Sequence, residues 1–179
     1  LQVWKEMKKE KLISQSLAYT FVEAPSLTLH KYLQQNSFDI VEWKSLLFQL
    51  FFTMALIQKE IPHFVHHDLI PKHIHLKKVP KGGQFVYTIN NIKYYVPNFG
   101  YIVKILPSVY SYSKNVYDNT IVHEEWVQTS LGIRPDNSQF YDIHSFCNHL
   151  YFTKNTPEYI KKKIENWVSD KDLLQTTNT

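Results

Sequence analysis

The sequence predicts an α+β fold that is mainly helical, and two observations carry this prediction. Apolar residues recur at spacings of three and four from Trp43 to Ile57, and three further phenylalanines widen this stripe, which indicates a long helix buried on most sides. Further on, the β-rich runs 85–89 and 92–96 flank Asn90-Asn91, a pair that tolerates the positive φ angles of a tight turn. We therefore expect a long helix followed by a β-hairpin.

The segment before the long helix contains three expected elements. Residues 1–15 are rich in lysine and indicate a helix or a solvated connector. Residues 17–23 alternate apolar and polar side chains and predict a short strand, which Pro25 ends. Residues 28–35 predict a short helix, because Leu29 and Leu33 lie four positions apart.

The segment after the hairpin adds one strand and two helices. Proline ends the strand at position 107, and the Tyr, Ser and Asn residues that follow have no periodicity and indicate a loop. Thr156 and Pro157 suit the N-cap and the first position of the last helix. The expected elements are a turn at 98–101, a strand at 102–106, a loop at 108–120, and helices at 138–151 and 157–168.

Length and charge restrict the class of protein. The 179 residues suffice for one domain with a sizeable core. The net charge is +4, but the lysines near both ends are not interleaved with aromatic residues, so solvated helix faces are favoured and binding to nucleic acid is not expected. The longest apolar stretch, 46–57, is well short of the roughly 20 residues that span a bilayer, so no membrane span is expected.

The single cysteine bears on the redox compartment. Cys147 has no second cysteine to pair with, and its neighbours Phe146 and Leu150 indicate a small buried apolar residue. A reducing compartment therefore fits the chain best.

The most informative motif is the run VHHDLIPKHIHL at positions 65–76. It resembles the catalytic loop of protein kinases, H-R-D-L-K-P-x-N-I-L-L. In that loop the aspartate accepts the proton of the substrate hydroxyl, and the asparagine five residues later holds a magnesium ion. The resemblance makes Asp68 the candidate catalytic residue, and it places His73 where kinases have the asparagine and Ile70 where they have a lysine.

The order of the expected elements extends this resemblance to a kinase hinge and C-terminal lobe. It implies that residues 1–25 are the end of the N-terminal lobe and the hinge, and that residues 26–179 form a kinase-like C-terminal lobe with the β-hairpin beside the catalytic-type loop. Glu23 and Ala24 are then the hinge residues that would bind a nucleotide cofactor. Residues 140–146 are similar to the start of the central helix of the lobe, in which the aspartate, here Asp142, braces the backbone of the catalytic loop.

A further run points to one branch of the kinases. Residues 97–106 read PNFGYIVKIL, which resembles the P-x-F-G-Y-x-x-K-I-I-D run of divergent Ser/Thr kinases that large DNA viruses encode. In kinases the aspartate after this strand chelates the magnesium ions that bridge the nucleotide phosphates, but here the position is Pro107. Both protein groups that hold metal are thus replaced, and imidazole is a poor ligand for magnesium. Pro25 also lacks the N–H with which a hinge would bond adenine.

Two alternatives for single groups of residues remain open. Five histidines lie between positions 63 and 75, so that His66, Asp68 and His73 could form a metal site, although packed histidines are the more ordinary interpretation and no metal is expected. The Tyr and Ser residues at 110–113 lie where an activation segment would be and could accept phosphate from another kinase, or could simply be exposed turn residues.

These features lead to two hypotheses about function. The first is a pseudokinase that acts as a binding or structural component through protein partners, for which the resemblance suggests the virion or the cytoplasm of an infected cell. It needs no cofactor. The alternative is an active viral Ser/Thr protein kinase that uses ATP and Mg²⁺, with Asp68 as the catalytic base.

Overall fold

The computed structural model describes residue 9, residues 27–35 and residues 39–168. Apart from Lys9, the elements expected at 1–15 and 17–23 lie outside the described residues, as do Glu23, Ala24 and Pro25 of the proposed hinge. The strands are β1 (Leu27–Thr28), β2 (Phe64–Val65), β3 (Ile74–Lys78), β4 (Gln84–Ile89), β5 (Ile92–Pro97), β6 (Tyr101–Ile105) and β7 (Tyr112–Ser113). The helices are α2 (Leu29–Gln35), α3 (Ile40–Glu60), α4 (Glu125–Leu131), α5 (Tyr141–Phe152) and α6 (Glu158–Trp167), with a 3₁₀ turn η1 (Thr120–His123).

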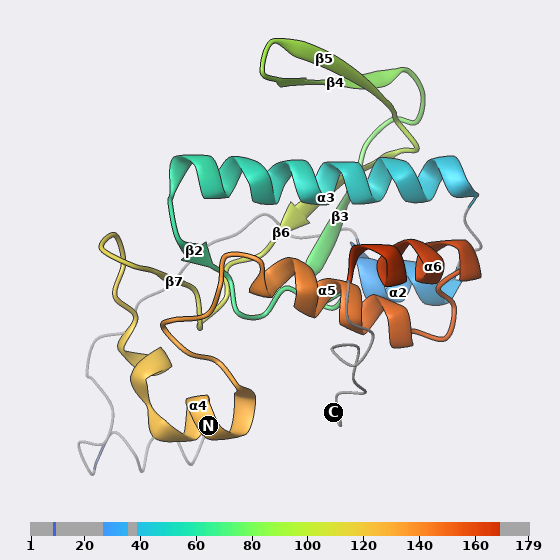
Figure 1. Cartoon of the computed structure of the whole chain (residues 1–179). Helices are drawn as coiled ribbons and strands as arrows, with labels where there is room; N and C mark the ends of the chain where they lie inside the picture. Colours follow the sequence, from blue (N-terminus) through green and yellow to red (C-terminus); the bar gives the residue numbers. More distant parts are fainter. Residues whose placement is uncertain (1–8, 10–26, 36–38, 169–179) are drawn as a thin grey trace.

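Helix α3 is the central element, with the β4–β5 hairpin on one side of it and α2, α5 and α6 on the other (Figure 1). It begins because Asp39 caps it, with Oδ1 accepting hydrogen bonds from the N–H groups of Val41 and Glu42, both at 2.8 Å. The expectation that it is buried on most sides is wrong in part. Its ends and one flank are open, since Ile40, Val41 and Leu56 are each exposed by 45–46%.

The length of α3 bears on the expectation that the chain has no membrane span. The helix has 21 residues, longer than the apolar stretch from which no span was expected. Within the part of the chain that the structure describes, it is the one helix long and apolar enough to cross a membrane by length and composition. A core helix passes the same test, and Trp43, Leu50 and Met54 are each exposed by 2% or less.

A small antiparallel sheet, β1-β3-β6, packs behind α3. Strand β3 was not predicted, because its residues fall within the kinase-like motif and were treated as loop. Ile74 and Leu76 of β3 are fully buried in the core, together with Trp43, Leu50 and Phe146. This core positions the loop that leads into β3.

The hairpin is confirmed, with β4 and β5 paired from Gln84↔Pro97 to Ile89↔Ile92. Its turn residues Asn90 and Asn91 have φ of 50° and 64°, as the two-residue turn requires. Tyr87 packs on Phe48 and Phe52 of α3, with ring centroids 5.3 and 4.7 Å apart. The hairpin is therefore attached to the helix by its inner face.

The segment expected to be a loop at 108–120 contains an element. Strand β7 lies in it and pairs with β2, with Phe64 opposite Ser113 and Val65 opposite Tyr112. Helix α4 was also missed. It packs through Val127 against Val122 and Ile133 in a separate small core. These elements are too short to show a periodic pattern in the sequence.

The last two helices are confirmed, at 141–152 and 158–167 rather than at the expected 138–151 and 157–168. The predicted cap is wrong. Pro157, not Thr156, has the N-cap position of α6, and the buried hydroxyl of Thr156 has no hydrogen-bond partner among the described residues. Proline fits here because it has no N–H to leave unpaired. Cys147 is buried on α5 as expected, and burial raises the pKa of its thiol to about 12.

Candidate active site

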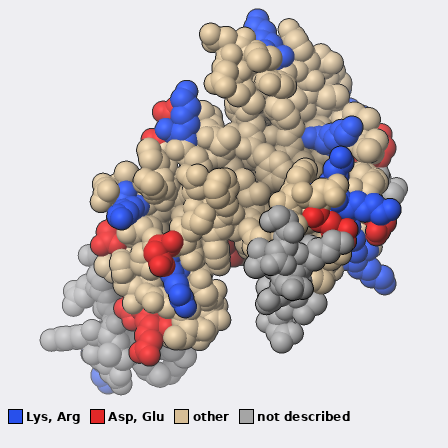
Figure 2. Space-filling model, viewed as in Figure 1, with Lys and Arg blue, Asp and Glu red and all other residues tan. Residues whose placement is uncertain are grey.

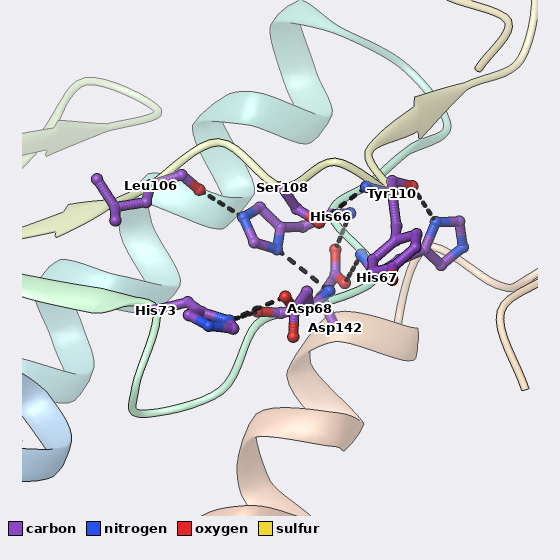
Figure 3. Close-up of polar contacts among 8 residues, drawn as sticks. All are labelled: His66, His67, Asp68, His73, Leu106, Ser108, Tyr110 and Asp142. Atoms are coloured by element: carbon purple, nitrogen blue, oxygen red, sulfur yellow. Dashed lines mark hydrogen bonds and ion pairs between the residues drawn. The ribbon is translucent and has the colours of Figure 1, made fainter. Parts of the chain in front are cut away.

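The catalytic-type loop runs from β2 to β3 and is fastened to the start of α5 by one carboxylate (Figure 3). Asp142 accepts hydrogen bonds from the backbone N–H groups of His66 at 2.7 Å and of His67 at 2.8 Å. Its side chain is fully buried, and the cost of that burial raises the pKa of the carboxyl although the two N–H groups and the neighbouring histidines oppose this. The expectation that Asp142 braces the loop backbone is confirmed.

His66 joins the same loop to the segment after β6. Its Nε2 lies 2.6 Å from the carbonyl oxygen of Leu106, and its Nδ1 accepts a hydrogen bond of 3.3 Å from the N–H of Asp68. These two contacts are satisfied together by the neutral ring with its proton on Nε2. Both ring nitrogens are thereby used, so His66 has no lone pair left for a metal ion.

His67 stands at the position of the kinase arginine and is turned into the protein. Its backbone is in the left-handed region, with φ of 65°. Its Nδ1 lies 2.8 Å from the carbonyl oxygen of Tyr110, and its ring packs edge-on against Tyr141. Burial lowers the pKa of His67 below its ordinary value of 6.5, so the neutral ring that donates from Nδ1 is favoured.

The candidate catalytic residue, Asp68, lies at the surface beside His73. The Nδ1 atom of His73 is 2.9 Å from the Asp68 carboxylate and 3.2 Å from the Asp68 carbonyl oxygen. The two side chains are exposed by 31% (Asp68) and 41% (His73). The group at the position of the kinase asparagine thus contacts the carboxylate of Asp68 directly.

Pro107 follows β6 on the other side of this loop. The next residue, Ser108, uses its hydroxyl to accept a hydrogen bond of 3.1 Å from the N–H of Tyr110 (Figure 3). Within residues 27–35 and 39–168, no three His, Cys, Asp or Glu side chains are grouped so as to hold a metal ion. His66, Asp68 and His73 are therefore not part of such a group among these residues.

A cavity of about 490 Å³ opens beside Asp68. It lies between the loop, the segment before α5 and the outer side of that helix. Its lining includes polar side chains, such as those of Ser145 and His149, that were not predicted as site residues, because their spacing in the sequence forms no recognisable motif. The lining residues are His67, Asp68, Ile70, Tyr110, Ser130, Leu131, Ile133, Tyr141, Ser145 and His149.

The residues considered for phosphorylation differ in their exposure. Tyr110, Ser111 and Tyr112 are partly exposed, whereas Ser113 is 1% exposed and its hydroxyl donates a hydrogen bond of 3.1 Å to the carbonyl oxygen of Pro62. Ser113 thus belongs to the packed β2–β7 pair, and it is not an exposed turn residue.

Comparisons with known proteins bear on this geometry. Over 146 residues, 78% of this chain, the sequence is 24% identical to the Acanthamoeba polyphaga mimivirus protein named "Putative serine/threonine-protein kinase R400". The chain is similar to a kinase-like viral protein. Over 62 residues, 33% of the chain, it is 36% identical to "Uncharacterized protein 011L" of Invertebrate iridescent virus 3.

The similarity is partial in extent. The chain spans 31% of the length of the mimivirus protein and 8% of the length of the iridescent virus protein. No family model and no solved structure matches the chain. The resemblance to viral Ser/Thr kinases inferred from the motifs is therefore confirmed at the level of similarity to a kinase-like viral protein.

Proposed function

We propose that this chain is the C-terminal lobe of a viral pseudokinase, which keeps the shape of the catalytic loop and acts by binding protein partners. The observation that carries the proposal is the contact of 2.9 Å between His73 and the carboxylate of Asp68. Phosphoryl transfer needs oxygen ligands for Mg²⁺ at two places around this aspartate. One of these places holds the imidazole of His73 and the other holds Pro107.

The interactions that set the shape of the loop support the structural half of the proposal. Asp142 and His66 hold the backbone of the loop from two sides, and neither contact needs a nucleotide or a metal ion. A loop whose backbone is fixed by contacts within the protein can present a constant surface to a protein partner. The cavity beside Asp68, which Tyr141, Ser145 and His149 help to line, is the place where we expect a protein partner to contact the loop.

The remaining proposals concern location and partners. We place the protein in the virion or the cytoplasm of the infected cell, because the proteins it resembles are viral. We propose that α3 is a core helix rather than a membrane span, since Ser45 and Gln49 on it bond to β5 and β6. Lys, Arg, Asp and Glu are interspersed on the face shown in Figure 2, which supports a protein partner over nucleic acid.

The proposal is tested by nucleotide binding to the full-length gene product, since the chain spans about a third of its mimivirus relative. Melting temperature is measured with and without ATP and Mg²⁺ for the native protein, for Asp68→Asn, and for His73→Asn combined with Pro107→Asp. We expect no shift for the native protein, because a ligand raises stability only if it binds the folded state. A shift in the double variant alone would show that the two replaced residues are responsible.

The alternative is an active viral Ser/Thr protein kinase that transfers phosphate from ATP to protein. The similarity to a viral protein named as a kinase favours it, as does the partial exposure of Asp68 next to a cavity. On this alternative, Mg²⁺ and ATP stabilise the native protein, and labelled phosphate passes to a protein substrate. Asp68→Asn then abolishes the transfer without lowering the melting temperature. That pair of results would overturn the pseudokinase proposal.

A further inference from the structure

Among the described residues, no strand pairs with the outer edge of β4 in the β4–β5 hairpin. In this antiparallel pair the residues bonded across the hairpin are at odd positions of β4, as the bond from the N–H of Asn98 to the carbonyl oxygen of Gly83 shows. The N–H and C=O groups of Gln84, Val86 and Thr88 therefore point away from β5. Within the described chain these groups have no hydrogen-bond partner, and the hairpin is a sheet of two strands.

The two edges of the hairpin differ in protection against pairing. The outer edge of β5 carries Lys93 and ends at Pro97, which has no N–H and whose carbonyl oxygen accepts a hydrogen bond of 2.8 Å from Ser45. Lysine and proline are the residues with which exposed edges are ordinarily blocked. Strand β4 reads QFVYTI and contains neither a charge nor a proline. The outer edge of β4 therefore carries no charged residue and no proline that would hinder pairing with a further strand.

An apolar patch lies on the outer face of the hairpin next to this edge. Val86 and Tyr95 are directly opposite each other, point to the same face, and are exposed by 55% and 60%. The inner face is covered by α3, with Tyr87 and Tyr94 on Phe48. Figure 1 shows the hairpin projecting from the side of α3 opposite to α5 and α6. The edge and the patch are therefore accessible to a large partner.

We infer that the edge of β4 pairs with β4 of a second copy of this chain, forming a four-stranded sheet across a two-fold axis. The outward positions read polar, apolar, polar in either direction, so that antiparallel pairing centred on Val86 sets Val86 against Val86 and Gln84 against Thr88. Each opposed pair then exchanges both of its N–H···O=C bonds. A partner selected by charge would have nothing to recognise, because the strand is uncharged.

The experiment measures the oligomeric state of the 179-residue chain by sedimentation velocity over a range of concentrations. We expect a monomer–dimer equilibrium. Val86→Lys sets two like charges against each other at the axis, and we expect it to raise the dissociation constant by about tenfold or more. The matched control is Tyr95→Lys, which puts the same charge on the same face but beside the protected edge, and it leaves the equilibrium unchanged.

A cysteine pair provides the second measurement. At the axis the two Cα atoms of residue 86 would lie about 5.5 Å apart, within the reach of a disulfide. Oxidised Val86→Cys is expected to form a covalent dimer, whereas Tyr95→Cys is not. Cys147 does not compete, because it is 3% exposed and its thiol pKa is raised.

Three results would overturn the inference. The first is a chain that stays monomeric at every concentration and does not cross-link through position 86. The second is an equal loss of dimer in Val86→Lys and Tyr95→Lys, which would mean that the patch stacks face to face and the edge is not used. The third is a dimer that neither variant affects, which would place the contact elsewhere.

Discussion

Asp142 shows how one residue shapes the candidate site. A carboxylate is costly to bury, and the hydrogen bonds that this one accepts from two N–H groups of the loop offset part of that cost. Removing the carboxylate leaves two N–H donors unpaired inside the protein. The free-energy cost of these unpaired donors exceeds the net stabilisation that the two hydrogen bonds contribute. Asp142 therefore acts on the position of Asp68 through the backbone of His66 and His67.

We expect Asp142→Ala to lower the free energy of unfolding by about 2–5 kcal/mol, from two unsatisfied buried N–H groups. Urea denaturation of the two proteins measures the difference. The control is Asp136→Ala, since Asp136 is exposed and a surface change of this kind is expected to stay within about 0.5 kcal/mol. Equal stability of Asp142→Ala and the native chain would contradict the role given to Asp142.

His67 predicts a dependence of stability on pH. Its pKa in the folded protein lies below the ordinary value of 6.5, so below pH 6.5 the unfolded chain binds a proton that the folded chain does not. Stability therefore falls as the pH falls through and below 6.5. His67→Asn should flatten this slope. The measurement is the free energy of unfolding against pH.

At the scale of elements, Gln49 explains how a helix and a sheet are joined. Its Oε1 accepts a hydrogen bond of 3.0 Å from the N–H of Val103, and its Nε2 lies 3.4 Å from the carbonyl oxygen of Tyr101. The side chain of a core residue of α3 thus closes the outer edge of β6, beside which the described residues form no further strand. Gln49, a polar residue within the apolar stripe of α3, thus forms the hydrogen bonds to β6 that a neighbouring strand would otherwise form.

Replacing the amide of Gln49 by an apolar group of similar size should separate the contribution of its hydrogen bonds to β6 from that of its packing in the core. Gln49→Leu leaves the N–H of Val103 without its partner, and we expect a loss of about 1–3 kcal/mol of stability. In this variant we expect the amides of β6 to exchange hydrogen faster than in the native protein, and this increase should precede any increase at the amides of α3. Lys44→Leu, on the exposed side of the same helix, is the control for the change in helix composition.

The turn of the hairpin gives a second prediction at this scale. Asn90 and Asn91 both have positive φ, which costs a residue with a branched side chain about 1–2 kcal/mol. Asn91→Val should therefore speed hydrogen exchange in β4 and β5, whereas Asn91→Gly should slow it or leave it unchanged. Faster exchange in both variants would mean that the asparagine side chain, rather than the backbone angle, holds the turn.

At the scale of the whole molecule, the elements that the sequence predicted correctly are those marked by a long or distinctive local pattern of residues. The long apolar stripe at 43–57 and the Asn90-Asn91 turn were sufficient for α3 and the hairpin, because each depends on local residues. The bracing of the loop by Asp142 was predicted through a family resemblance. Strands β2 and β7 were missed, since each has two residues and owes its existence to pairing across about 50 positions.

The contact between His73 and Asp68 was not predicted either. The sequence placed His73 at a metal position, but only the fold of the loop brings its ring to the carboxylate. Such a contact depends on backbone angles that no spacing of residues reports. The cavity lined by Ser145 and His149 was missed for the same reason.

The hairpin is separable from the rest of the molecule. The N–H of Val79 bonds to the carbonyl oxygen of Gly100 at 2.9 Å, so residues 80–99 leave and re-enter the sheet at one place. Replacing them by Asn-Gly should keep β3 paired with β6 and abolish the dimer, while uncovering Phe48 and Phe52. Circular dichroism and sedimentation measure the two outcomes. Loss of all structure would contradict this separability.

The long reach of Asp142 has a consequence for synthesis on the ribosome. The carboxylate and the amide of His66 that it accepts are 76 positions apart in the chain. A nascent polypeptide that has already exposed the whole motif at 65–76 still lacks the anchor that gives the motif its form. The loop is therefore fixed only after α5 has emerged from the ribosome. A chain that terminates before residue 142 would contain the whole sequence of the motif but not the hydrogen bonds from Asp142 that fix its backbone.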